Sequence, residues 1–181
     1  MGANSFTSVL HLGHRNILRY CPRPFSSVDD MDQTLICRWN SPLRSNDTVY
    51  VLGDFSLAPA DQVRDYLNQL AGRKILILGN HDRKPTDSVW AEIHESLLVE
   101  AEGHRFYLHH YPVRDWPSKW HGTIHLYGHV HGNLRPLPGS MDVGVDTWGG
   151  APISVIEILR AVEPFNPESE TVSESFAVRT W

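Results

Sequence analysis

Five short apolar stretches of this chain each end in residues whose side chains bind metal ions. In chain order the endings are Val9-Leu10-His11-Leu12-Gly13-His14, Gly53-Asp54, Gly79-Asn80-His81-Asp82, His109-His110-Tyr111-Pro112 and Gly128-His129-Val130-His131-Gly132. Apolar, β-branched stretches of this length that stop at glycine are typical of buried strands. In an open α/β sheet the functional crevice lies beyond the carboxyl ends of the strands, so we expect these loops to converge on one site.

The chemistry of these endings is that of a transition-metal site. Imidazoles, a carboxylate and a carboxamide oxygen suit Mn, Fe, Zn or Co better than the oxygen-only shell that Ca²⁺ and Mg²⁺ prefer. A carboxylate such as Asp54 can bridge two ions, and two ions about 3.5–4 Å apart can clamp a phosphate and activate water. Taken singly, each motif has an ordinary explanation, since a lone Gly-Asp is usually a turn and a lone histidine is usually structural. The prediction of a metal site therefore rests on all five endings together, each of which follows an apolar stretch.

The first half of the chain alternates between strands and helices. We expect strands at residues 6–10, 48–52 and 74–78, and helices at 59–70 and 87–97. A further helix is expected from an N-cap at Ser26 or Ser27 to about Trp39, because Val28, Met31, Leu35 and Trp39 recur at helical spacing.

The second half is dominated by strands, which we expect at 98–101, 105–109, 123–127, 141–145 and 153–158. This order predicts an α/β (α+β) fold with a mixed sheet sandwich covered by helices. Residues 1–160 are expected to form the domain, and residues 161–181 an acidic, weakly structured tail.

Composition narrows the function classes. Lys+Arg 16 against Asp+Glu 21, a net charge of −5, gives no basis for broad nucleic-acid binding. Two cysteines without paired spacing predict reduced thiols in a cytoplasmic protein. The N-terminal segment does not have the pattern of a signal peptide, and no apolar run is long enough to span a bilayer, so no membrane association is expected.

Taken together, these motifs resemble the calcineurin-like metallophosphoesterases, in particular the small bacterial members described only as predicted phosphoesterases or phosphohydrolases. The matching stretches lie within residues 5–158 and are HLGHRNILRYCPRPFSSVDDMDQTLICRWN, DTVYVLGDFS, GRKILILGNHD, LHHYPVRDW, HLYGHVHG and DVGVDTWGGAPIS. The resemblance implies a four-layer αββα sandwich, two mixed β-sheets flanked by helices. It also implies two divalent metal ions (Mn, Fe, Zn, Ni or Co) and hydrolysis of a phosphodiester or phosphomonoester through a metal-activated water.

The resemblance assigns roles residue by residue. The first metal would take His11, Asp54 and His131, and the second would take Asp54, Asn80, His110 and His129. His110 is preferred to His109 because it directly precedes Tyr-Pro. His81 is implied as the catalytic histidine, which stabilises the phosphoryl group or protonates the leaving oxygen. Asp82 either orients His81 or caps its own loop.

Val9 departs from the pattern, because this position normally supplies a carboxylate to the first metal. Valine has no ligand atom, so first-metal affinity should fall by at least the roughly tenfold to hundredfold that loss of an outer-shell partner costs. Three accounts are open. The protein works with one tight metal at the second site, or it is inactive, or another carboxylate such as Asp142 or Asp146 reaches in.

Several residues near the motifs have competing interpretations. His14, Arg15 and Asn16 could line the phosphate pocket or begin a capped loop, and Arg83 and Lys84 could attract an anion or form a solvated turn. Trp116, Trp120 and Trp148 could stack on a nucleobase, although packing under a loop is favoured. His104, His121 and His125 are expected to be structural.

The leading hypothesis is a metallophosphoesterase acting on a small phosphoester or nucleotide. The alternative is a catalytically inactive binding module on the same scaffold. A nuclease is a weaker third hypothesis, because the chain is small and acidic. The sequence leaves the oligomeric state open.

Overall fold

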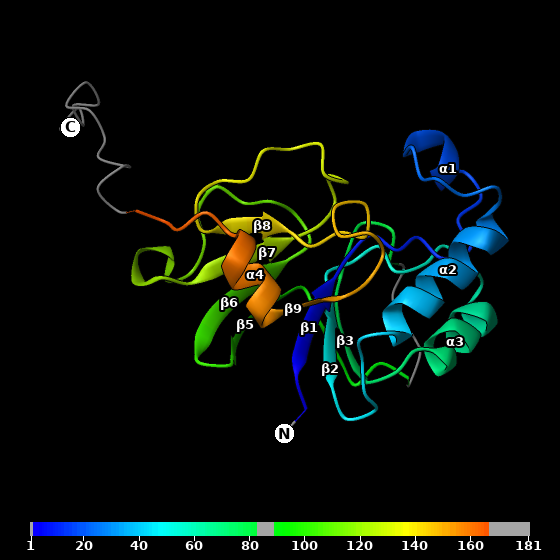
Figure 1. Ribbon diagram of the computed structural model, residues 1–181, viewed down its shortest axis with the longest axis horizontal. Coiled ribbons are helices and arrows are strands. Elements are labelled where there is room, and N and C mark those ends of the chain that lie inside the picture. Colours follow the sequence, from blue (N-terminus) through cyan, green and yellow to red (C-terminus); the bar gives the residue numbers. More distant parts are fainter. Residues whose placement is uncertain (1, 83–88, 167–181) are drawn as a thin grey trace, which may run out of the picture.

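The fold is built on two β-sheets, seen in a computed structural model that describes residues 2–82 and 89–166 (Figure 1). The first sheet has the order β4-β3-β2-β1-β9, with β1 Asn4–Thr7, β2 Thr48–Val51, β3 Arg73–Ile77, β4 Glu92–His94 and β9 Ile153–Ser154. The second has the order β5-β6-β7-β8, with β5 Ser96–Ala101, β6 His104–His109, β7 Ile124–Tyr127 and β8 Ser140–Asp142. The helices are α1 Ile17–Tyr20, α2 Val28–Asn40, α3 Ala60–Gln69 and α4 Val155–Ala161, with a short 3₁₀ helix at Lys119–His121.

Both sheets are mixed. Strands β1 to β4 are parallel and β9 is antiparallel to β1, while in the second sheet β5 is antiparallel to β6, and β6, β7 and β8 are parallel. The predicted α/β class, two mixed sheets flanked by helices, is therefore confirmed. Because β1, β2 and β3 run in one direction, their carboxyl ends lie at one edge of the first sheet.

Two apolar cores hold the layers together. Between α2, α3 and the first sheet lies a helix-side core that includes Met31, Leu35, Trp39, Val51 and Leu76. The inter-sheet core packs the other face of the first sheet against the second, and includes Phe6, Leu52, Ile77, Phe106 and Leu126. Figure 1 shows α2 and α3 side by side on one flank of the first sheet and α4 on the other side of the molecule.

Helix α2 begins where the sequence predicted. The Ser27 hydroxyl accepts a hydrogen bond from the Asp30 backbone N–H at 3.1 Å, which satisfies one of the unpaired donors of the first turn. Met31, Leu35 and Trp39 are buried on one face, as their spacing predicted.

The helix expected at 87–97 is wrong. Residues 92–94 instead form β4, which pairs in parallel with β3, and residues 96–101 form β5 of the second sheet. Backbone bonds from Ala91 N to Lys74 O and from Leu78 N to His94 O join this segment to β3. Pairing with the open edge of β3 outweighs the helical propensity of the segment.

The strand expected at 153–158 is also wrong beyond Ser154. Helix α4 starts there with a capping box, in which the Ser154 hydroxyl accepts from Glu157 N and the Glu157 carboxylate accepts from Ser154 N. Val155 and Ile158 then enter the inter-sheet core. The Ser-x-x-Glu spacing in the sequence is the local signal for this helix start.

The start of the expected tail packs on the domain. Gly139 N donates to Glu163 O at 2.7 Å, and the Phe165 ring lies 5.1 Å from Trp120. Residues 167–181 lie outside the described part, so the boundary at residue 160 stays a prediction. Cys21 is buried and Cys37 exposed, and both are free thiols as expected. Within residues 2–82 and 89–166, no helix has the length and apolarity to cross a bilayer.

Candidate metal centre

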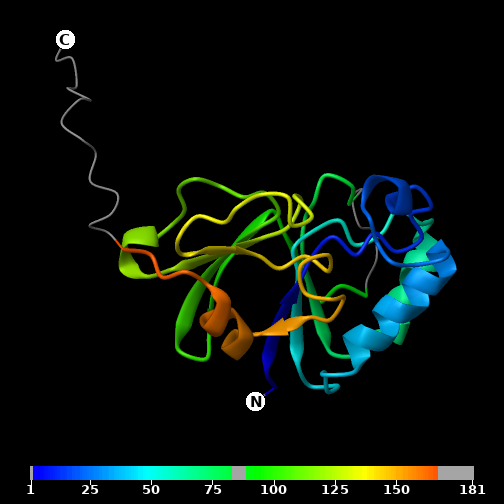
Figure 2. The same ribbon diagram turned by 45° about the horizontal axis from the view of Figure 1, so that its top comes forward.

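The loops that follow β1, β2, β3, β6 and β7 meet at one end of the sandwich (Figure 2). Backbone bonds hold them in register. Val9 N donates to Gly53 O and His11 N donates to Asp54 O, both at 3.0 Å, and Gly128 N donates to His110 O at 3.0 Å. These bonds join the first ending to the second and the fourth to the fifth, and the contact between His110 Nδ1 and Leu52 O at 2.8 Å links the two sheets.

One cluster, which we call the second-metal cluster, joins Asp54, Asn80, His110 and His129. Asn80 Oδ1 lies 3.0 Å from both His110 Nε2 and His129 Nδ1. Asp54 Oδ2 lies 3.5 Å from His110 Nε2. Ligand atoms of Asp54, His110 and His129 all lie within 4.8 Å of one another, which is the spacing that one ion would need.

The environment sets the protonation of this cluster. His110 is buried and its Nδ1 lies 2.8 Å from Leu52 O, so Nδ1 is the donor and Nε2 faces the cluster. Burial alone would lower the His110 pKa, but the Asp54 carboxylate and the Leu52 carbonyl raise it. Burial also disfavours ionised Asp54, yet His110 and the His81 backbone N–H hold its pKa below its usual range. Asp54 is therefore a carboxylate, as a ligand must be.

On the other side of Asp54, His11 lacks hydrogen-bond partners within the described residues. The residue is 2% exposed, and neither Nδ1 nor Nε2 has a hydrogen-bond partner. Nε2 lies 3.6 Å from Asp54 Oδ2, and burial lowers the pKa of His11 to about 3, so the ring is neutral. A buried, unpaired polar group costs roughly 1–3 kcal/mol, which a coordinated ion would offset. The His11–Asp54 pair therefore fits a metal ion.

His131 is held by an ion pair that we call the Arg23–Asp146 anchor. His131 Nδ1 lies 2.7 Å from Asp146 Oδ2, and the Arg23 guanidinium binds both Asp146 oxygens at 2.7 and 2.9 Å. Arg23 also donates to Val9 O and Leu10 O, at 2.6 and 2.8 Å. Burial opposes ionisation of Asp146, but His131 and Arg23 lower its pKa to about 2.

Asp142 and Asp146, the two carboxylates considered as replacements at the first-metal side, have different partners. Asp146 reaches His131, while Asp142 accepts from the backbone N–H groups of Gly132 and Gly144. Cys21, His131 and Asp146 also offer ligand atoms within 4.8 Å of one another. A cation there would oppose the Arg23 guanidinium, so we interpret this trio as a support that fixes the tautomer and direction of the His131 ring.

Backbone strain gathers at the same loops. Five non-glycine residues there adopt a left-handed backbone: Val9 (φ 52°), His11 (54°), Asp54 (55°), His129 (64°) and His131 (50°). Such conformations cost of order 1–3 kcal/mol each and cluster at functional sites. At Val9 the cost is largest, because a β-branched residue is a true outlier in this region, whereas Asp is enriched there. Aspartate would therefore adopt the backbone conformation at position 9 at a lower cost than valine does.

The Val9 side chain itself belongs to the helix-side core. It is fully buried, and its Cγ2 lies so close to Gly144 that a Cβ there would meet it at 2.8 Å. It packs as an apolar residue, and it leaves the first-metal side without the carboxylate expected at this position.

His81 and Asp82 have different surroundings. The His81 ring lies edge-on to His11, 5.4 Å between centroids, and its backbone N–H donates to Asp54 Oδ1 at 2.9 Å. The Asp82 carboxylate accepts from the backbone N–H groups of Gly79 and Asp54 at 2.8 Å and of Phe55 at 3.0 Å. These bonds support the loop-cap interpretation of Asp82.

The predicted substrate residues His14, Arg15 and Asn16 differ in their contacts and exposure. His14 joins the imidazole cluster, with its centroid 5.5 Å from His11 and 6.3 Å from His81. Arg15 is exposed, and Asn16 occupies the N-cap position of α1 without a side-chain cap bond. Arg83 and Lys84 lie outside the described residues.

Two of the three tryptophans, Trp116 and Trp148, favour the packing interpretation. The indole N–H groups of Trp116 and Trp148 donate to Thr123 O and Asp142 O, both at 2.8 Å. Trp120 is 52% exposed and contacts Phe165. His110 Nε2 lies 3.0 Å from Asn80 Oδ1, whereas His109 Nδ1 bonds to the backbone of Tyr111.

Fold and site together define an α/β sandwich protein with a histidine-rich candidate metal centre. No protein-family model matches the chain. It is 35% identical over 162 residues to the uncharacterized protein MJ1445 of Methanocaldococcus jannaschii, covering 84% of this chain and 87% of that protein. It is 30% identical over 180 residues to the gene 66 protein of Mycobacterium phage L5, with 80% and 86% covered.

The chain therefore belongs to the protein family that contains MJ1445 and the phage gene 66 protein. Among solved structures, it is similar to AQ665 from Aquifex aeolicus, a protein of unknown function, with a TM-score of 0.74 and 26% identity over 90% of this chain and 100% of that one. MJ1445 is uncharacterized and AQ665 is of unknown function, so the functional proposal rests on the chemistry of the site.

Proposed function

We propose that this protein is a metal-dependent phosphoesterase that hydrolyses a phosphodiester or phosphomonoester. The observation that carries the proposal is His11, a neutral, buried imidazole with two unpaired nitrogens, 3.6 Å from a buried and ionised Asp54. A fold without a ligand at this point would leave those groups at a net cost. The resemblance of the motifs to metallophosphoesterases gives the reaction class.

The chain offers two half-sites that share Asp54. The second-metal cluster would hold one ion through Asp54, Asn80, His110 and His129, and His11, Asp54 and His131 would hold the other. Divalent ions in such a site polarise phosphoryl oxygens and make water acidic enough to attack near neutral pH. The Val9 substitution leaves the first half-site with one carboxylate, which favours tighter binding in the second.

Asp82 and His81 have supporting roles: the first positions the ligand loops, and the second supplies a proton or stabilises charge. Asp82 ties the loops of Gly79 and Asp54 together, so that Asn80 and Asp54 stay in register. The His81 ring lies beside both His11 and His14, where it can donate a proton to the oxygen of the departing alcohol or stabilise charge on the phosphoryl group. The proposed substrate is a small phosphoester or a nucleotide.

The second candidate is a binding module that has lost the chemistry. Val9, a buried valine where a carboxylate is expected, is the observation that favours it. The close approach of Asp54, Asn80, His110 and His129, together with the His11–Asp54 pair, favours the enzyme, because a site released from selection would be expected to lose more than one ligand.

Hydrolysis of a chromogenic phosphodiester with Mn²⁺ tests the proposal. Three proteins are compared: this chain, Val9→Asp and His81→Ala. Turnover by this chain that His81→Ala removes supports an enzyme that tolerates the missing ligand. Silence in this chain with turnover in Val9→Asp supports the binding module. Silence in all three, with several divalent metals, would reject the phosphoesterase.

A further inference from the structure

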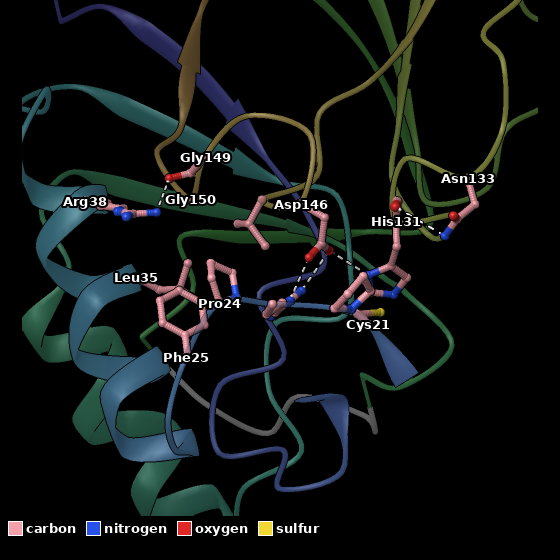
Figure 3. A pocket seen from close by; sticks show the side chains of 13 residues that line it. Cys21, Pro24, Phe25, Leu35, Arg38, His131, Asn133, Asp146, Gly149 and Gly150 are labelled. Carbon is pink, nitrogen blue, oxygen red and sulfur yellow. Dashed lines mark hydrogen bonds and ion pairs between the residues drawn. The ribbon is translucent and has the colours of Figure 1, made fainter. Parts of the chain in front are cut away.

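A cavity of about 330 Å³ adjoins the first-metal side of the site (Figure 3). In Figure 3, Pro24, Phe25 and Leu35 are grouped on one side of it and Cys21, His131 and Asn133 on the other, with Asp146 between them. Since His131 lines the cavity and its ring also stacks on His11 at 5.2 Å, the cavity and the candidate metal centre share a wall.

The walls of the cavity are mostly apolar. Leu35 and Val145 are 2% and 5% exposed, Phe25 packs at the margin of the helix-side core, and Pro22 and Pro24 add rigid rings. An apolar wall with an aromatic ring gains most from an aromatic group that it can cover.

The polar groups lie at the floor and the rim. At the floor, the Asp146 carboxylate is neutralised by Arg23, so this part of the cavity attracts neither a cation nor an anion strongly. At the rim, Arg38 donates one hydrogen bond to Gly149 O at 2.7 Å, and the Asn133 amide is exposed. A guanidinium presents five N–H donors and a flat face, which suits both a hydrogen-bond acceptor and a planar ring.

We infer that this cavity holds a planar aromatic group of nucleobase size that belongs to the substrate, while the phosphoryl group lies at the metal ligands. The inference rests on the proposed function and deepens it, because it selects aromatic phosphoesters of the nucleotide class over aliphatic ones. Inside the cavity, the neutralised Asp146 and the apolar walls favour an uncharged ring over a phosphate. The volume, near the lower end of the roughly 300–1,000 Å³ typical of ligand sites, suits one such group rather than a polymer.

Binding of adenosine and cytidine tests the inference, because neither has a phosphoryl group to hydrolyse. Saturation-transfer NMR and ligand titration on the full chain with Zn²⁺, which is diamagnetic, measure binding through the base protons. We compare the unchanged chain with Phe25→Ala, which removes the aromatic wall, and with Asn133→Trp, which fills the rim from an exposed position. Asn68→Trp, an exposed asparagine on α3 outside the cavity lining, is the matched control.

We expect at least one nucleoside to bind, and both cavity variants to weaken it by about fivefold or more, as loss of base stacking does. Asn68→Trp should bind within about twofold of the unchanged chain, the scatter expected for surface changes. Absence of binding by both nucleosides, or equal binding by all four proteins, overturns the inference. Phosphodiester turnover together with unaltered nucleoside binding in the variants would reject the cavity assignment alone. Localised nucleoside binding without any turnover would reject the phosphoesterase and leave the cavity as a binding site.

Discussion

His11 and His125 are both buried histidines, but the partners of their ring nitrogens differ. His125, in the second sheet, is fully buried, its Nδ1 lies 3.1 Å from Tyr107 O, and its Nε2 accepts from Val113 N at 3.2 Å. His11, in the loop after β1, has no partner for either nitrogen within the described residues. Since both rings are neutral through burial, the difference lies in hydrogen bonding. One histidine completes a core, and the other has both ring nitrogens available to the proposed metal ion.

The backbone conformations around His11 and His125 also differ. Regular strand pairing supports the segment around His125, whereas His11 and four neighbours in the site adopt left-handed backbone. Strained, unpaired groups persist only where the surrounding structure holds them. Here the parallel strands and the Arg23–Asp146 anchor supply that support.

The largest effect is expected for Asp54→Asn, which removes the carboxylate that both half-sites share. We expect no measurable phosphodiester hydrolysis and loss of bound Mn²⁺, because a direct ligand counts for more than an outer-shell partner worth roughly tenfold to hundredfold. Turnover with Mn²⁺ and metal content after dialysis are the measurements. Asp61→Asn, on α3, is the control, and retained metal in Asp54→Asn would contradict the two-half-site assignment.

Acid should destabilise the second sheet through His125. Burial lowers its pKa to about 4 from 6.5, so below about pH 6.5 the unfolded chain binds more protons than the native one. This contribution to stability is therefore complete above pH 6.5 and is lost as the pH falls toward 4, by up to about 3 kcal/mol.

Urea unfolding of the unchanged chain and His125→Gln at pH 7 and pH 4 measures this contribution. The variant should lose less stability between the two pH values, although it is less stable at neutral pH. His104→Gln, at an exposed position, should behave like the unchanged chain. Identical pH dependence in all three proteins would show that His125 is not the buried neutral group described here.

Val9→Asp should strengthen metal binding beside His11. Aspartate adds a ligand atom beside His11 and tolerates the left-handed backbone, so Mn²⁺ affinity at the weaker half-site should rise by roughly tenfold to hundredfold. Calorimetric titration with Mn²⁺ measures it. Val9→Ala removes the β-branched side chain without adding a ligand and should leave the affinity unchanged. Equal gains in both variants would assign the effect to strain rather than to coordination.

The smallest effect is expected far from the site, at the start of α4. Ser154→Ala removes one half of the capping box and should cost about 1 kcal/mol of unfolding free energy. Urea unfolding measures the loss, with the exposed Ser45→Ala as control, and Mn²⁺ affinity should not change. A change in metal affinity would mean that α4 is coupled to the metal centre.

Much of the fold followed from local sequence signals. Spacing and residues a few positions apart indicated the apolar strands β1, β2 and β3 and the Ser27 cap of α2. The preference for His110 over His109 likewise rested on the adjacent Tyr-Pro. Helix α4 had such a signal in Ser154 and Glu157, and the expectation of a strand there overlooked it. Strand β4 had no local signal, because it forms only where the edge of β3 offers backbone partners.

The sequence by itself determined which side chains capable of binding a metal this protein has, and that they follow apolar strands. Composition and periodicity are local properties, so they can be read without the fold. Tertiary structure alone decided that His11 is left without partners, that Arg23 pairs with Asp146 123 residues away, and that a cavity opens beside His131. Each of these depends on segments distant in the chain meeting in one orientation. Backbone pairing and core packing select that orientation, and neither is encoded within a single motif.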